Sequence, residues 1–107
     1  MPTLTSAENK IIRTAFSLWF DTDIVSFPSH ELKKINSNIL SANGKLLRGQ
    51  YNFTPAELRS IEYSLINFLG MLNEPPADAD LNDIRRNGAM YKSLAFSAAF
   101  KLSIDLD

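Results

Sequence analysis

Residues 51–58, YNFTPAEL, contain the clearest helix start in the chain. Thr54 and Glu57 have the spacing of a capping box, in which each side chain accepts a hydrogen bond from the backbone amide of the other residue. Pro55 occupies the first helical position, where its missing N–H costs nothing. Together with the Glu-Pro-Pro stop at 74–76, these signals predict a long helix over residues 55–73.

Three more helices are predicted from apolar residues that recur at helical spacing. A second capping box, Thr5 with Glu8, begins the first of them, and Asp80 is the expected N-cap of the last. Gly44 is the expected stop of the helix between these two, because glycine adopts the left-handed conformation without steric cost. No internal repeat is apparent. The predicted ranges of these helices are 6–20, 29–43 and 81–102.

Short connections between amphipathic helices predict an all-α fold, a compact bundle of four main helices that forms a single helical domain over residues 1–107. The helix over 55–73 has the widest apolar sector, so we expect it to lie centrally. In the tail, Leu102, Ile104 and Leu106 alternate with polar residues, and this period predicts a short C-terminal strand.

Composition excludes several classes of protein. Hydrophobic residues make up 45% of the 107 and charged residues 21%, which is typical of a globular domain. The formal net charge of -1 gives no global attraction to nucleic acid or to anionic membranes. The absence of cysteine excludes disulfides, thiolate nucleophiles and iron–sulfur sites. We find neither a signal peptide nor a run of about 20 apolar residues, so we expect a cytoplasmic protein without membrane contact.

Catalytic and metal-binding patterns are also missing from the sequence. His30 is the single histidine, and its neighbours Ser29 and Glu31 do not make a triad, because consecutive helical residues point in different directions. No glycine-rich phosphate loop occurs, and the Asp-rich stretches fail the spacing of a calcium loop. We therefore expect no catalytic, cofactor-binding or metal-binding residues, no cofactor and no enzymatic activity.

A basic segment over residues 33–59 suggests an alternative function. Its five cations stand against the single acid Glu57, a local balance of +4. A regulator that binds nucleic acid through these side chains is one hypothesis. A helix-turn-helix is disfavoured, because the first turns of the helix over 55–73 would present Glu57 and Glu62 beside one arginine. The candidate contacts to an anion or nucleic acid are Lys33, Lys34, Lys45, Arg48 and Arg59.

The last helix is apolar on two sides after Gly88, more than a small monomer of this size readily covers. We therefore expect a non-catalytic helical protein that acts through protein–protein contacts as a homodimer. The candidate dimer interface is Tyr91, Leu94, Phe96 and Phe100. A further alternative is a small-ligand binder or an enzyme of unknown reaction. Its candidate polar groups are His30, Tyr51, Arg59 and Tyr63.

Overall fold

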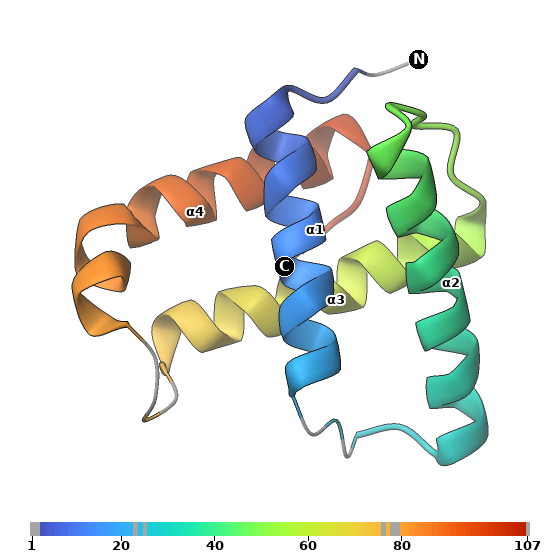
Figure 1. Cartoon of the computed structure of the whole chain (residues 1–107), viewed down its shortest axis with the longest axis horizontal. Helices are drawn as coiled ribbons and strands as arrows, with labels where there is room; N and C mark the ends of the chain where they lie inside the picture. The colour runs from blue at the N-terminus through green and yellow to red at the C-terminus, as the bar shows by residue number, and fades with distance from the viewer. Residues whose placement is uncertain (1–2, 23, 25, 76, 78–79, 107) are drawn as a thin grey trace.

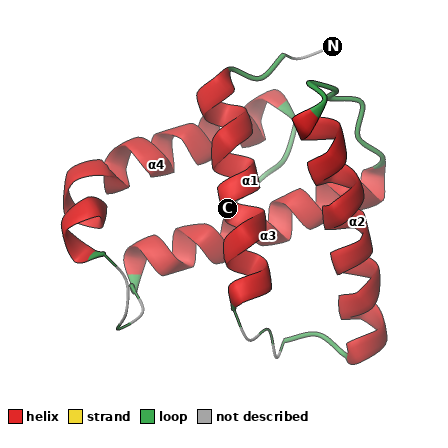
Figure 2. Ribbon diagram, viewed as in Figure 1, coloured by secondary structure: helices red, strands yellow, loops and turns green. Residues whose placement is uncertain are grey.

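The described residues form four helices (Figure 1). The structure is a computed structural model that describes residues 3–22, 24, 26–75, 77 and 80–106. The helices are α1 (Ser6–Asp21), α2 (Ser29–Leu47), α3 (Pro55–Asn73) and α4 (Leu81–Lys101). Figure 2 shows only helices and loops over the described residues, so the predicted all-α fold is confirmed. No helix within these residues combines the length and the apolar character that a bilayer crossing requires.

α1 and α3 form the central pair of the bundle, and each contacts all three other helices. α2 packs mainly against α3, and α4 packs mainly against α1. In Figure 1 the two outer helices accordingly lie on either side of the crossing of α1 and α3. The prediction that the helix over 55–73 lies centrally is confirmed, with α1 sharing that position.

The core fills the crossing of α1 and α3. The apolar residues that recur at helical spacing on α1 are buried: Ile11, Ile12, Ala15, Phe16 and Trp19. From α3 it meets Ile61, Leu65, Phe68 and Leu72. Small residues on α4, namely Ala95, Ala98 and Ala99, are also buried. Because small side chains allow close approach of helix axes, α4 can pack tightly on α1 without large side chains of its own.

α2 continues past its predicted end at Gly44 and stops only at Leu47. Gly44 has ordinary helical geometry, and the left-handed residue is Gly49, with a φ of 69°. The Gly49 amide donates to the Leu46 carbonyl at 3.1 Å, which closes the last turn in a Schellman motif. The predicted boundary at 43 is therefore wrong. Either glycine could end the helix, and only Gly49 does so.

The tail after α4 does not form the predicted strand within the described residues. α4 ends at Lys101 with Leu102 as its cap, and Ser103 adopts a φ of 59°. The Ile104 amide donates to the Ala99 carbonyl at 2.8 Å, another Schellman bond. The alternation of the tail was misleading, because a strand needs a neighbouring strand for its backbone groups.

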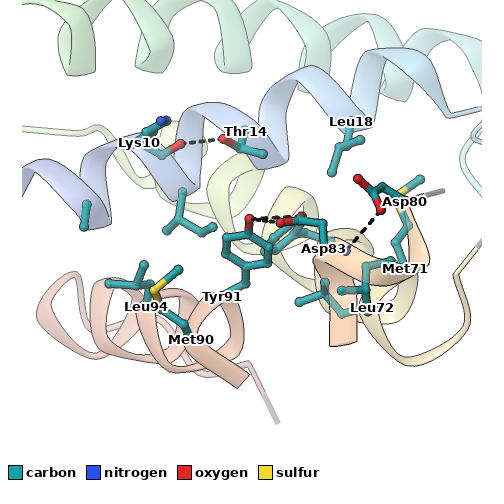
Figure 3. Close-up of a pocket in the computed structure, with 14 residues that line it drawn as sticks. Lys10, Thr14, Leu18, Met71, Leu72, Asp80, Asp83, Met90, Tyr91 and Leu94 are labelled. Atoms are coloured by element: carbon teal, nitrogen blue, oxygen red, sulfur yellow. Dashed lines mark hydrogen bonds between the residues drawn. The ribbon is translucent and has the colours of Figure 1, made fainter. Parts of the chain in front are cut away.

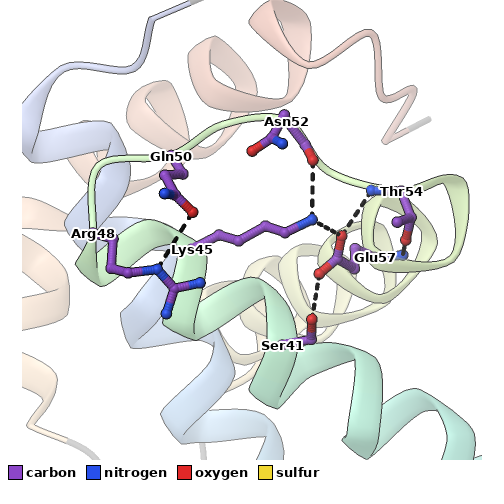
Figure 4. A network of polar contacts seen from close by, with 7 residues as sticks. All are labelled: Ser41, Lys45, Arg48, Gln50, Asn52, Thr54 and Glu57. Carbon is purple, nitrogen blue, oxygen red and sulfur yellow. Dashed lines mark hydrogen bonds and ion pairs between the residues drawn. The ribbon is translucent and has the colours of Figure 1, made fainter.

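The capping box of α3 is also a buried ion-pair site (Figure 4). Glu57 is only 2% exposed, and its carboxylate accepts bonds from Ser41 Oγ and Lys45 Nζ on α2, each at 2.6 Å. Burial alone would raise the pKa of Glu57, but the bonds from Lys45, Ser41 and Thr54 outweigh it and lower the pKa to about 2.

The capping box of α1 is built in the same way. Glu8 is 2% exposed, and its carboxylate accepts from Lys101 Nζ at 2.7 Å and from the Ser97 hydroxyl, both on α4. Burial tends to raise the pKa of Glu8, and the bonds from Lys101, Ser97 and Thr5 lower it to about 2. Two equivalent carboxylates therefore join α1 to α4 and α3 to α2.

The matching clusters reveal an internal repeat that the sequence analysis missed. Residues 5–8 read TSAE and residues 54–57 read TPAE, while residues 41–46 read SANGKL and residues 97–102 read SAAFKL. Through these residues α1 binds α4 and α3 binds α2, so the first helix of each sequence half binds the second helix of the other half. The expectation of no repeat is wrong at these positions, where only the few side chains of the two clusters are shared.

Candidate functional site

α4 presents apolar side chains on two surfaces outside the core. The structure places the four residues of the predicted dimer interface on these two surfaces rather than on one. Tyr91 and Leu94 line a groove between α1, α3 and α4. Phe96 and Phe100 point outward and are 46% and 85% exposed. The sequence correctly indicated two apolar sides of α4, but helical spacing alone did not show that each side forms a separate surface.

The groove runs along α1 and has a volume of about 630 Å³ (Figure 3). α1 contributes a stripe at helical spacing, with Ala7, Ile11 and Leu18 among its members. The opposite walls come from α3 and α4 and include Met71, Leu72, Met90 and Leu94. The surface of the groove is therefore mainly apolar, and two of its wall residues are flexible thioethers that adapt to different shapes.

Three of the described residues that line the groove carry charge. In Figure 3, Lys10 lies toward one end, Asp80 lies at the other end near Leu18, and Asp83 lies between Asp80 and Tyr91. The Tyr91 hydroxyl donates to the Asp83 carboxylate at 3.0 Å. Burial, together with the hydrogen bond to Asp83 and its charge, raises the pKa of Tyr91, so the phenol keeps its proton. Tyr91 thus holds the Asp83 carboxylate in place inside the groove.

The outer surface of α4 combines a protruding aromatic ring with a hollow. Phe100 is the most exposed of the large apolar side chains among the described residues. Next to it lies a hollow of about 420 Å³, whose walls include Phe96, Ala99, Ile104 and Leu106. The hollow exists because the tail turns back at Ser103 and places its apolar residues beside α4. A protruding ring and an open, mainly apolar hollow therefore lie side by side.

The predicted basic residues do not form one compact patch. Lys45 is 19% exposed and donates to Glu57 at 2.6 Å and to the Asn52 carbonyl at 3.0 Å. Lys33 and Arg48 are exposed at opposite ends of α2, about 22 Å apart along the helix axis at 1.5 Å per residue. Lys34 is exposed beside Lys33.

Arg48 donates through Nε to Gln50 at 3.3 Å, and Arg59 is exposed on α3. The expectation that Glu57 lies on an exposed surface is wrong. Glu57 is buried and neutralises Lys45, so the strongest interaction of the basic segment is internal.

The polar groups considered for a ligand site have separate structural surroundings. Tyr51 accepts a bond from the Asn9 amide at 3.3 Å, which ties the loop before α3 to α1. Tyr63 packs against Phe27 with ring centroids 5.1 Å apart. His30 and Arg59 are exposed on different helices. Two of the four groups are thus used in packing.

The ends of the groove were missed by the sequence analysis. Asp80 was interpreted as a helix cap, which it is, since its carboxylate accepts from the Asp83 amide at 3.1 Å. Lys10 was not considered. Ala7 and Leu18 widen the apolar side of α1 beyond its buried residues, and this is the signal that could have indicated a groove.

No family model matches this chain, and no curated protein and no solved structure matches it significantly. The geometry of the described residues is therefore the basis of the functional interpretation.

Proposed function

We propose that this protein is a non-catalytic helical protein that acts through protein–protein contacts as a homodimer, with the surface around Phe96 and Phe100 as the dimer interface. The observation that carries the proposal is the 85% exposure of Phe100 beside an apolar hollow. An exposed phenylalanine of this extent places apolar area in water that a partner could cover.

A twofold arrangement makes this surface complementary to itself. In an isologous dimer the same patch is used twice, so Phe100 of each chain enters the hollow of the other.

The proposal is tested by the mass of the protein in solution. Light scattering during size exclusion at micromolar concentration should give twice the 12.0 kDa of one chain. Phe100→Asp should give a monomer, because two carboxylates would then be buried at the interface without partners. The matched control is Leu40→Asp, which changes a residue that is 63% exposed on α2 and should leave the dimer intact.

Circular dichroism of both variants should match the parent, since both positions are exposed on helices. A parent protein with the mass of one chain would contradict the proposal, and so would a dimer that persists in Phe100→Asp.

The other functions have less support. Nucleic-acid binding would lack Lys45, which is held by Glu57, and would rely on four cations spread over α2 and α3. A cytoplasmic location and the lack of catalysis remain predictions from the sequence.

A further inference from the structure

We infer that the groove between α1, α3 and α4 binds an amphipathic helix of a partner protein, with an acidic side chain of that helix at Lys10 and a basic one at Asp80 and Asp83. This site is separate from the dimer surface, because Tyr91 and Leu94 line the groove while Phe96 and Phe100 line the hollow.

The length of the groove matches a short helix. Its stripe on α1 runs from Ala7 to Leu18, which spans about 16 Å or three turns. An amphipathic helix that docks into a groove places apolar residues at i, i+3 or i+4, and i+7, so two to three turns of it are in contact. The groove of about 630 Å³ therefore takes one row of such side chains along its length.

The chemistry of the walls favours a helical peptide over a small molecule. Sites for small ligands place a few converging polar groups around the ligand. Here Lys10 and Asp80 lie toward opposite ends, the Asp83 carboxylate is already bonded by Tyr91 and Asn87, and most of the remaining wall is apolar, with Met71 and Met90 among its residues. Methionine-rich grooves accommodate apolar helix faces because the thioether side chain is unbranched and flexible.

The charges at the ends select the occupant. Among the described residues, neither Lys10 nor Asp83 forms an ion pair. Asp83 accepts only neutral donors, the Tyr91 hydroxyl and the Asn87 amide at 2.7 Å. Lys10 and Leu18 are about 12 Å apart along α1, or a little over two turns. A bound helix with an acid and a base about two turns apart would neutralise both ends.

The test uses an amphipathic peptide of about 16 residues, stapled so that it stays helical in isolation. The peptide carries leucines on one face, with one glutamate and one lysine about two turns apart beside them. The control peptide replaces the glutamate with lysine. Simple exchange of the two charges would be a poor control, because a helix can bind in either direction along a groove.

Binding is measured by fluorescence anisotropy and by the methyl signals of methionine in NMR spectra. The parent protein should bind the Glu/Lys peptide about tenfold more tightly than the Lys/Lys peptide, a difference typical of one charge pair at a partly buried site. Lys10→Glu makes both ends of the groove acidic and should reverse this preference. The signals of Met71 and Met90 should shift on binding.

Two kinds of control variant separate this proposal from the others. Ala7→Trp and Thr14→Trp each place an indole in the groove and should abolish peptide binding. Phe100→Asp should bind the peptide as the parent does, so failure of the dimer proposal would leave this result unaffected.

Three outcomes would overturn the proposal. The first is equal affinity for both peptides, which would indicate non-specific binding to an apolar surface without recognition of the charges. The second is a shift of Met71 and Met90 by dodecanoate but not by either peptide, which identifies the occupant as a small amphiphile. The third is dissociation of a dimer by Thr14→Trp, which identifies the occupant as a second copy of this chain.

Discussion

The α2 side and the α4 side of the central helix pair share the same kind of anchoring cluster. The two sides differ in how the space beside that cluster is filled. On one side, Phe27 packs between Trp19 and Tyr63, with ring centroids 6.3 and 5.1 Å away, and Trp19 Nε1 donates to Asn36 at 2.9 Å. On the other side, Phe68 and Tyr91 lie 6.3 Å apart at the edge of an open groove.

The comparison indicates where stability and function reside. A buried glutamate cluster occurs on each side, around Glu8 on the α4 side and around Glu57 on the α2 side, because each cluster joins an outer helix to a central one. Among the described residues the aromatic filling is not repeated, since none of them covers the groove as Phe27 covers the other side. We therefore expect a partner to bind on the α4 side, where the surface is open, rather than on the α2 side, where it is closed.

The largest expected effect is the pH dependence of stability, and measuring it tests whether the Glu8 and Glu57 clusters are equivalent. The pKa of Glu8 and of Glu57 is about 2 in the folded protein and near 4.5 in the unfolded chain. A lowered folded pKa means that the stabilisation is fully present above 4.5 and is lost as the pH falls toward 2. We expect a loss on the order of 3 kcal/mol per carboxylate, measured by urea unfolding across this range.

Glu8→Gln and Glu57→Gln should each remove part of this pH dependence. Lys45 is less exposed than Lys101, at 19% against 34%, so Glu57→Gln should remove the larger part. Unfolding free energies that stay constant between these pH values would contradict the prediction.

A smaller effect is expected when the aromatic packing around Phe27 is removed. Phe27→Ala should lower the free energy of unfolding by about 2–3 kcal/mol, because the ring packs against both Trp19 and Tyr63. The matched change on the open side is Met90→Ala, where the side chain is 52% exposed. That variant should change stability by less than about 0.5 kcal/mol. Similar losses in the two variants would show that the groove is filled in solution.

The smallest expected effect is a change in stability at the C-terminal ends of α2 and α4. Ser103 has a φ of 59°, which costs a residue with a Cβ about 1 kcal/mol, so Ser103→Gly should stabilise the protein by about 0.5–1 kcal/mol. Gly49 has a φ of 69°, and Gly49→Ala should destabilise it by about 1 kcal/mol. Thermal unfolding of the two variants should shift in opposite directions. A change of the same sign in both would contradict the account of these turns.

Local signals were sufficient to predict where the helices begin. The boxes at Thr5 and Thr54 and the cap at Asp80 are all present in the structure, because a capping bond joins residues three apart and depends on little else. The spacing of the apolar residues likewise indicated the buried side of α1 and most of the buried side of α3.

The missed features depend on residues far apart in the chain. Glu8 meets Lys101 across 93 positions, and nothing near Glu8 indicates that its carboxylate is buried. Lys45 was counted among the free cations because its partner Glu57 lies on another helix.

By itself, the sequence determined the helical class, the helix starts and the two apolar sides of α4. Only the tertiary structure decided that these sides form a groove and a separate exposed hollow, and that the two capping carboxylates are ion-pair sites. The physical reason is range: a helix is specified by bonds and contacts within one or two turns, whereas a groove is the space that several packed helices leave between them.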